Sequence, residues 1–345
     1  MADLRFNQAG LAGLVTAVGG RVVTFESEWE RLGLSPEEGS RLQRSIGFGT
    51  RHVIARPNTT TADLCLHAAG DLLRGLDLKP ADLDGLIFVT QTPDYAAPST
   101  AIAMQHRLGM RTDTLCFDVR LGCSGFVYGL SLAYSFVQSG LSRVLLCVGD
   151  VASRMVAPDD RTITPLMGDA GAAALIERRP TESFFQLYSD GSGEKALFIP
   201  GSGMRTDEAD RDMPAYMRMD GAAVFNFTLK RVPPLLIDIL ALSGQAADAI
   251  DYFVLHQPNK YILKNVQRRL NLDESRLPTA TQSVYGNQNA ASIPGTISGF
   301  LTEAYATRSL RSVLAGFGVG LSWGACAIET DRLYAPPSLT FEAQV

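Results

Sequence analysis

The sequence contains little of what marks metal-binding, secreted or membrane-spanning proteins. Its five cysteines are scattered over 345 residues, and they form no CxxC pair and no Cys/His spacing suited to zinc. No window approaches the roughly 18 unbroken apolar residues of a membrane span, and no basic segment followed by a long apolar run begins the chain. We therefore expect single thiols in a reducing compartment, a cytoplasmic location, no metal site and no membrane contact.

Positive charge is scarce as well. The formal net charge is −5, so no overall positive field would attract phosphates, and we expect no nucleic-acid partner. Charged residues make up 19% of the chain and hydrophobic residues 46%, which is typical of a compact globular enzyme. The length is sufficient for one large domain or two ordinary ones.

Short apolar runs rich in β-forming residues alternate with helical patterns along the chain. Continuous apolar runs of this kind predict strands that are covered on both faces, and their alternation with helices predicts an α/β fold. The runs lie at residues 85–90, 117–119, 143–148, 252–256 and 312–315.

The order of these features repeats. Asp84 and Asp251 precede strands and lie 167 residues apart; the motifs around Cys123 and Asn287 lie 164 apart; the strands that follow each motif lie 169 apart. We therefore predict two related halves, residues 1–178 and 179–345, whose loops bearing Cys123 and Asn287 face one another. Between the halves, the polar stretch 200–220 predicts a loop that is either a lid or an ordinary solvated connector.

Cys123 begins a segment, residues 123–139, that is apolar nearly all round and stops before Gly140, so we predict a buried helix. Free N–H groups and the dipole at a helix start favour an anion there. A thiol whose pKa shifts from near 8.5 to about 7 is half ionised at neutral pH, which suits a nucleophile. The alternative is a buried structural cysteine.

Two further polar residues stand at the ends of apolar segments. His256 directly ends a strand pattern, where open α/β folds place chemistry, although a buried core histidine fits equally well. Asn287 follows Gly286 and precedes small residues, so it is either functional or a turn former or helix cap. A glycine-rich turn at 315–324 could direct a backbone N–H at a developing oxyanion.

Taken together, six segments in order resemble β-ketoacyl-acyl-carrier-protein synthase III, a branch of the thiolase-like condensing enzymes. They are residues 118–126, 158–161, 167–171, 256–259, 286–294 and 316–324, and they span nearly the whole chain. The resemblance implies a thiolase-like fold in which two pseudo-symmetric α/β halves form a five-layered αβαβα core.

The same resemblance implies a catalytic triad of Cys123, His256 and Asn287. Cys123 would take an acyl group from an acyl-CoA or acyl carrier protein, and malonyl-acyl carrier protein would then lose CO2 and attack it. The backbone N–H groups of Cys123 and Val319 would form the oxyanion hole. The implied substrate and CoA contacts are Arg161, Gly221, Phe225, Asn259 and Phe317. No cofactor is implied beyond the thioester substrates, and a homodimer is expected.

Several positions depart from the family pattern. Arg41 and Ser45 stand where acetyl-CoA-using members carry a Trp and an Arg, and Ala97 stands where a bulky Phe crosses the dimer. The glycine of the oxyanion turn is Val319 here. We therefore expect a longer or unusual acyl donor. Two other functions stay open: acyl transfer to an alcohol or amine without condensation, and a non-catalytic subunit that shapes a partner's pocket.

A basic stripe follows His256 on a predicted helix at residues 260–270. Lys260, Lys264 and Arg268 are four residues apart on one face, and Arg269 adjoins them. Because acyl carrier proteins are acidic, the stripe is a candidate docking surface; an ordinary solvated helix face is the alternative.

Overall fold

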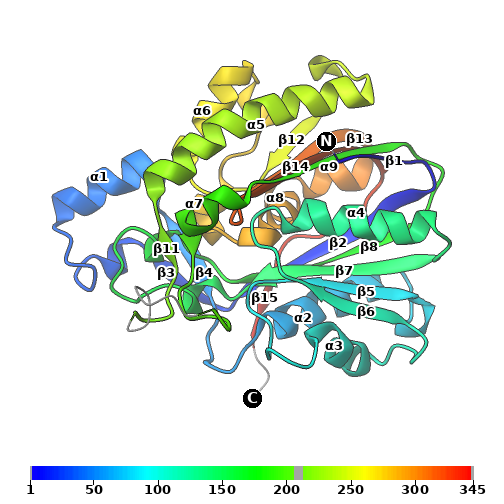
Figure 1. Cartoon of the computed structure of the whole chain (residues 1–345), viewed down its shortest axis with the longest axis horizontal. Coiled ribbons are helices and arrows are strands. Elements are labelled where there is room, and N and C mark those ends of the chain that lie inside the picture. Colours follow the sequence, from blue (N-terminus) through cyan, green and yellow to red (C-terminus); the bar gives the residue numbers. More distant parts are fainter. Residues whose placement is uncertain (1, 206–212, 343–345) are drawn as a thin grey trace.

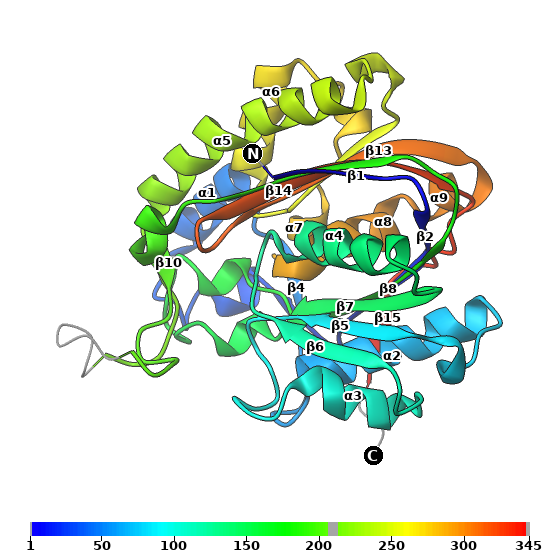
Figure 2. The same ribbon diagram turned by 45° about the vertical axis from the view of Figure 1, so that its right-hand side comes forward.

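The computed structural model describes residues 2–205 and 213–342. Two large β-sheets lie face to face with helices between them and on both outer sides, so the molecule has five layers (Figures 1 and 2). This is the thiolase-like αβαβα arrangement predicted from the sequence. Part of the predicted 200–220 loop, residues 206–212, lies outside the described residues.

The first sheet has six strands in the order β15-β2-β8-β7-β5-β6. The strands are β2 (Ala9–Gly19), β5 (Gly85–Val89), β6 (Leu115–Val119), β7 (Arg143–Asp150), β8 (Ala170–Arg178) and β15 (Leu339–Phe341). Helices α2 (Thr61–Gly75) and α3 (Thr100–Leu108) cover its outer face. Helices α4 (Gly125–Gln138) and α8 (Ser292–Phe300) lie between the two sheets.

The second sheet has five strands in the order β1-β9-β14-β13-β12. They are β1 (Ala2–Phe6), β9 (Ser183–Ser189), β12 (Tyr252–Leu255), β13 (Ser309–Gly318) and β14 (Ser322–Asp331). Helices α5 (Gly221–Ser243) and α6 (Lys260–Leu270) cover its outer face (Figure 1). The smaller elements are β3 (Arg21–Thr24), β4 (Thr50–Val53), β10 (Leu197–Phe198), β11 (Arg218–Met219), α1 (Pro36–Ile46), α7 (Thr281–Tyr285) and α9 (Thr302–Thr307).

The two large sheets share one pattern of strand directions, as two related halves would. In the first sheet β2 and β8 are antiparallel, β8 and β7 antiparallel, and β7 and β5 parallel. In the second sheet β9-β14-β13-β12 repeats the same directions in the same order. The ends of the chain cross over: β1 joins the second sheet and β15 joins the first.

Strand β5 shows why these strands are apolar throughout. Ile87 and Val89 are fully buried in the central core, where the two sheets sandwich α4. Leu86 and Phe88, the alternate residues, are fully buried on the other side, in the cluster that α2 and α3 cover. A strand whose two faces are both covered has no position for a polar side chain. Within residues 2–205 and 213–342, no helix is both long enough and apolar enough to cross a bilayer.

Candidate active site

Cys123 lies in the tight turn that connects β6 to α4. The Gly125 N–H donates to the Gly122 carbonyl at 2.7 Å, and α4 starts at Gly125. Strand β13 passes directly over this turn: a Cβ added at Gly316 would lie 2.8 Å from the Cys123 carbonyl oxygen, and one at Gly318 would lie 2.8 Å from Sγ. The two glycines therefore allow the second half of the molecule to press against the thiol, which is only 7% exposed.

His256 follows β12 in the second half and is 2% exposed. Its Nδ1 lies 3.1 Å from Ser292 Oγ, at the start of α8, and its ring meets Phe317 edge-on with centroids 5.5 Å apart. These contacts hold the imidazole in one orientation between a strand, a helix and an aromatic ring.

Asn287 is held by its backbone against the first half. Its N–H donates to the Leu166 carbonyl at 2.6 Å and its carbonyl accepts from Gly168 N–H at 3.1 Å. Gly286 precedes it with φ +81°, and a Cβ there would lie 2.8 Å from the Gly168 nitrogen, so only glycine fits. The prediction that Gly286 supplies an unusual backbone angle is confirmed.

The three side chains line one narrow cavity of about 70 Å³. Cys123 comes from the first half of the chain, and His256 and Asn287 come from the second. The structure therefore brings together the three residues that the sequence selected. The apolar part of the lining includes Leu166, Met167, Leu197, Met217, Ile262 and Phe317.

Asn289 contacts all three of these residues and was not identified from the sequence. Its Oδ1 lies 3.8 Å from Cys123 Sγ, and its backbone N–H donates to Asn287 Oδ1 at 3.0 Å. Its backbone carbonyl faces the His256 imidazole. Its backbone is left-handed at φ +46°, a conformation that Asn tolerates better than most residues. The residue pattern at 286–290 gave only a turn signal, and the family resemblance pointed to Asn287 alone.

Asp150, at the end of β7, is a second buried polar residue that the sequence did not single out. Its Oδ1 accepts from the Gln91 N–H at 2.7 Å and from Thr90 Oγ1 at 3.0 Å. Its Oδ2 and the Asn289 Nδ2 are both buried without a hydrogen-bond partner among the described residues. Burial raises the pKa of Asp150 to about 7, against the hydrogen bonds from Gln91 and Thr90 that lower it.

The resting site is electrically neutral at the thiol and the imidazole. Burial raises the pKa of Cys123 to about 12, outweighing the backbone N–H groups of Val319 and Cys123 that lower it, and nearby Asp150 raises it further. Burial lowers the pKa of His256 to about 3, opposed by the carbonyl of Asn289. Ionisation at neutral pH, which would suit a nucleophile, is therefore not favoured in the empty site, because burial disfavours the thiolate more than the helix start stabilises it.

The comparisons with known proteins agree with this geometry. Residues 117–191 match the family model of 3-oxoacyl-(acyl-carrier-protein) synthase III, and residues 240–330 match the model of that family's C-terminal part. The chain is 33% identical to a Campylobacter jejuni protein provisionally named 3-oxoacyl-(acyl-carrier-protein) synthase 3, covering 98% of both chains. It belongs to the 3-oxoacyl-(acyl-carrier-protein) synthase III family.

Solved structures of synthase III enzymes have the same fold. A 3-oxoacyl-(acyl-carrier protein) synthase from Burkholderia xenovorans LB400 matches with a TM-score of 0.94 and 34% identity, covering 98% of this chain and 99% of that one. The 3-oxoacyl-(acyl carrier protein) synthase III of Pseudomonas aeruginosa PAO1 matches with a TM-score of 0.82 and 29% identity, covering 94% and 98%. The chain is thus a condensing enzyme of the synthase III family.

The predicted substrate contacts of this synthase III are spread over a larger area than the triad. Asn259 and Phe317 line the catalytic cavity, and Asn259 also caps α6 by accepting from the Ile262 N–H at 2.9 Å. Phe225 is half-buried and stacks on Tyr261 with centroids 5.4 Å apart. Gly221 is exposed at the start of α5, and Arg161 lies at the surface, 3.9 Å from Glu38 of α1.

The predicted basic stripe lies on α6. Lys260, Arg268 and Arg269 are exposed and Lys264 is half-buried. Arg269 donates to the Leu229 carbonyl at 3.0 Å, and in the described part of the chain none of the four forms an ion pair. The first turn of the same helix contributes Ile262 to the cavity, so the stripe and the active site share one element.

Proposed function

We propose that this enzyme joins an acyl thioester to malonyl-acyl carrier protein by a decarboxylating Claisen condensation, releasing a 3-oxoacyl thioester. The observation that carries the proposal is the meeting of Cys123, His256 and Asn287 on one buried cavity, with two backbone N–H groups directed at the sulfur. A thiol, a neutral imidazole and a carboxamide are the groups that acyl transfer followed by enolate formation requires.

In the first half-reaction Cys123 becomes acylated. Because its thiol is protonated and His256 is neutral at rest, His256 accepts the thiol proton as sulfur attacks the acyl carbonyl carbon. The N–H groups of Cys123 and Val319 hold the tetrahedral oxyanion; losing one such donor typically costs about 10²–10³ in rate. The tetrahedral intermediate then breaks its bond to the CoA or carrier sulfur, and that thiolate leaves with the proton from His256.

In the second half-reaction the malonyl thioester loses CO2. His256 and Asn287 donate hydrogen bonds to the thioester oxygen while enolate character develops, and the resulting carbanion attacks the acyl-Cys123 carbonyl carbon. Asn289 N–H already occupies Asn287 Oδ1, so the NH2 group of Asn287 is the end left to donate. Collapse of the tetrahedral intermediate breaks the bond to the Cys123 sulfur and releases the 3-oxoacyl thioester. The Cys123 thiolate then takes up one proton from solvent.

The proposal includes the setting of the reaction. The substrates are thioesters and no other cofactor is required. All five cysteines are free, which suits the reducing cytoplasm. Homodimerisation is proposed through β6: this strand ends the first sheet and is partly exposed, with Leu115 40% exposed and Ile102 on the neighbouring α3 53% exposed.

Intact-mass measurement tests the proposal. Purified protein is incubated with acyl-CoAs of two to twelve carbons, then with malonyl-acyl carrier protein, and protein mass, CO2 and product mass are recorded. We expect one acyl group on Cys123 and a 3-oxoacyl product, with medium-chain donors faster than acetyl-CoA. Cys123→Ala should abolish acylation, whereas Asn287→Ala should still acylate but lose decarboxylation.

Other products would identify the alternatives. An ester or amide formed without CO2 would indicate acyl transfer to an alcohol or amine, and no acylation with any donor would indicate a non-catalytic subunit. Either result would overturn the condensation. Rates highest with acetyl-CoA would overturn only the expectation of a longer donor.

The docking role of the α6 stripe is part of the proposal. Replacing Lys264 and Arg268 by Glu should raise the KM for malonyl-acyl carrier protein at least tenfold at low salt and much less at high salt, because an acidic carrier would meet two reversed charges. Acylation by acyl-CoA should not change. Lys79→Glu is the control: it reverses the charge of an exposed lysine in the loop after α2 and should leave this KM unchanged. An unchanged KM at low salt would refute docking on this face.

A further inference from the structure

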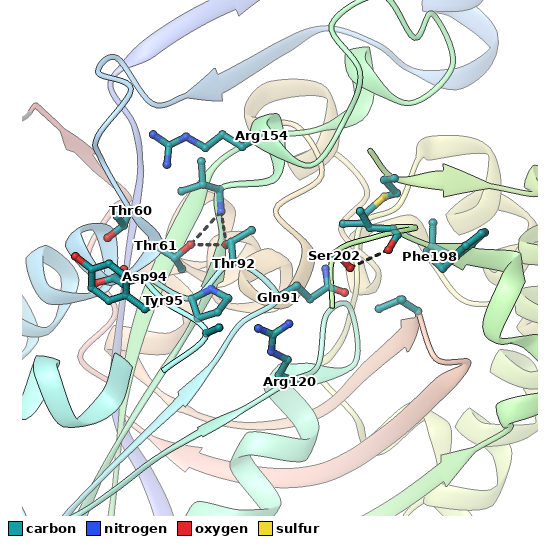
Figure 3. Close-up of a pocket in the computed structure, with 17 residues that line it drawn as sticks. Thr60, Thr61, Gln91, Thr92, Asp94, Tyr95, Arg120, Arg154, Phe198 and Ser202 are labelled. Atoms are coloured by element: carbon teal, nitrogen blue, oxygen red, sulfur yellow. Dashed lines mark hydrogen bonds between the residues drawn. The ribbon is translucent and has the colours of Figure 1, made fainter. Parts of the chain in front are cut away.

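A second and larger pocket of about 600 Å³ opens beside the catalytic cavity (Figure 3). The loop after β5, the end of β6, the segment 151–154 and residues 197–202 form its walls. Four residues line both spaces: Gln91, Leu197, Met217 and Val319. The larger pocket, called the chamber below, is therefore separated from Cys123 by the thickness of single side chains.

Gln91 and Val319 form the part of this partition nearest the thiol. A Cβ built on Gly122, the residue before Cys123, would lie 2.4 Å from Gln91 Oε1 and 2.7 Å from Val319 Cγ1. Both side chains therefore pack on the backbone that positions the sulfur. Among the described residues Gln91 Nε2 has one hydrogen-bond partner, the Met155 sulfur at 4.0 Å, a weak contact that a substrate chain can displace. An acyl group on Cys123 can thus extend past Gln91 into the chamber.

Two arginines, both exposed to solvent, give the chamber positive charge among the described residues. Arg120, immediately after β6, and Arg154, in the segment after β7, both line it, and in the part of the chain that the structure describes neither has an ion-pair or hydrogen-bond partner. In the view of Figure 3, Gln91 and Thr92 lie between these two labelled arginines. Among the described lining residues Asp94 is the one acid, and its Oδ2 lies 3.9 Å from Arg107, outside the lining.

The rest of the lining suits a chain with an anionic end. Leu197, Ile199 and Val151 offer apolar surface to methylene groups, while the hydroxyl of Thr60 and the phenol of Tyr95, which is 69% exposed, can donate hydrogen bonds to a ligand. A guanidinium binds a carboxylate through charge-assisted, often paired hydrogen bonds. A terminal methyl would leave both guanidinium groups without such a partner.

We propose that the acyl donor of this enzyme ends in a carboxylate, as in the monothioester of a medium-chain dicarboxylic acid, and that Arg120 and Arg154 bind this carboxylate in the chamber. The inference rests on the proposed function, because the thioester end of the same donor acylates Cys123. The far carboxylate takes no part in bond making or breaking. Acylation still forms the Cys123 thioester, breaks the donor thioester and releases CoA with the thiol proton.

Two donors of equal length test the proposal: the CoA monothioester of octanedioic acid and octanoyl-CoA. Second-order rate constants for acylation of Cys123 are measured by intact mass on the full-length enzyme. We expect the carboxylated donor to react about ten- to a hundredfold faster, the range for one charge-assisted hydrogen bond at 25 °C. Arg120→Gln and Arg154→Gln should each erase most of that preference by slowing only the carboxylated donor, and Arg120→Lys should keep part of it.

Arg178→Gln is the control. Arg178 is an exposed arginine at the end of β8 and does not line the chamber, so this variant should leave the ratio of the two acylation rate constants unchanged. Octanoyl-CoA reacting as fast as the carboxylated donor in every variant would overturn the chamber assignment while leaving the condensation intact. Acylation by neither donor, nor by any other acyl-CoA, would overturn both. If the arginine variants instead slow only the later reaction with malonyl-acyl carrier protein, the recognised carboxylate belongs to the acceptor, and the donor proposal is overturned.

Discussion

Alkylation of Cys123 by iodoacetamide tests the neutral resting state of the site. With the pKa of Cys123 raised to about 12, about 1 thiol in 10,000 is ionised at pH 8, whereas about 1 in 4 is ionised for a free thiol with a pKa of about 8.5. The thiolate is the reactive form, so Cys123 should react about three orders of magnitude more slowly than free cysteine. The logarithm of the rate should rise by about one per pH unit from pH 8 to 10, without a plateau.

The shape of this profile is decisive because restricted access to a buried sulfur also slows alkylation but does not depend on pH. Alkylation is located by peptide mass, and Cys123→Ser protein measures the background from the other cysteines, of which Cys116 is half-buried. A sigmoidal profile with a midpoint between pH 4 and 8 would refute the reasoning, since it would indicate a thiolate paired with a protonated His256 before substrate binds.

The variant Asp150→Asn removes a negative charge near Cys123 and so tests the alkylation rate in a second way. Asp150 has a pKa of about 7, so its charge, which raises the pKa of Cys123, is present above pH 7 and absent below. The variant should therefore alkylate faster than the wild type above pH 7 and equally fast below pH 6. Equal rates at pH 9 would show that Asp150 does not act on the sulfur.

Three further predictions follow from the same contacts. Asn289→Ser should lower kcat for condensation about tenfold or more with little change in KM, because the thiol loses the Asn289 Oδ1 beside it and the left-handed backbone that places the Asn289 N–H on Asn287 Oδ1 is less favourable for Ser; an unchanged kcat would show that the Asn289 side chain does not act in the site. The pKa of Asp150 is raised on folding, so its contribution to stability is present below pH 4 and lost as pH rises through 7. The unfolding free energy of Asp150→Asn relative to wild type should therefore increase over this range by roughly 4 kcal/mol, measured by denaturant titration, and a flat difference would contradict it. Gly286→Ala should destabilise by about 1–3 kcal/mol in thermal unfolding, because φ is +81° and Gly168 is 2.8 Å from the new Cβ, whereas Gly191→Ala, which meets nothing within 4 Å, should not.

The sequence predicted the parts of the fold that depend on local pattern. The apolar runs at 85–90, 143–148 and 252–256 are β5, β7 and β12, and the helix expected over 123–139 is α4, which begins two residues later. The near-equal offsets led to the prediction of two related halves, and the two sheets share one order of strand directions. The sequence could not predict that β1 joins the second sheet and β15 the first, because local pattern does not determine which sheet edge a terminal strand pairs with.

The candidate site was predictable where a residue type stands out and not where only geometry distinguishes it. Cys123 and His256 are scarce residue types at the ends of apolar segments. Asn289 and Asp150 are ordinary residues in a turn and at a strand end, and only the folded contacts give them importance. The protonation state of Cys123 could not be predicted from the sequence. The helix start, which favours a thiolate, is visible there, but the burial that disfavours it depends on the contact of Gly316 and Gly318, from the other half of the chain, with Cys123.

The exchange of end strands affects how the molecule can form. The outer edge of β2 is paired by β15, and β1 is paired by β9, so neither half closes both edges of its sheet with its own residues. When only the first half of the chain has been synthesised, β1 lacks its partner β9 and one edge of β2 lacks its partner β15. The catalytic thiol then lies beside a surface that becomes covered only when β13 has been synthesised, so a competent active site is among the last features to assemble.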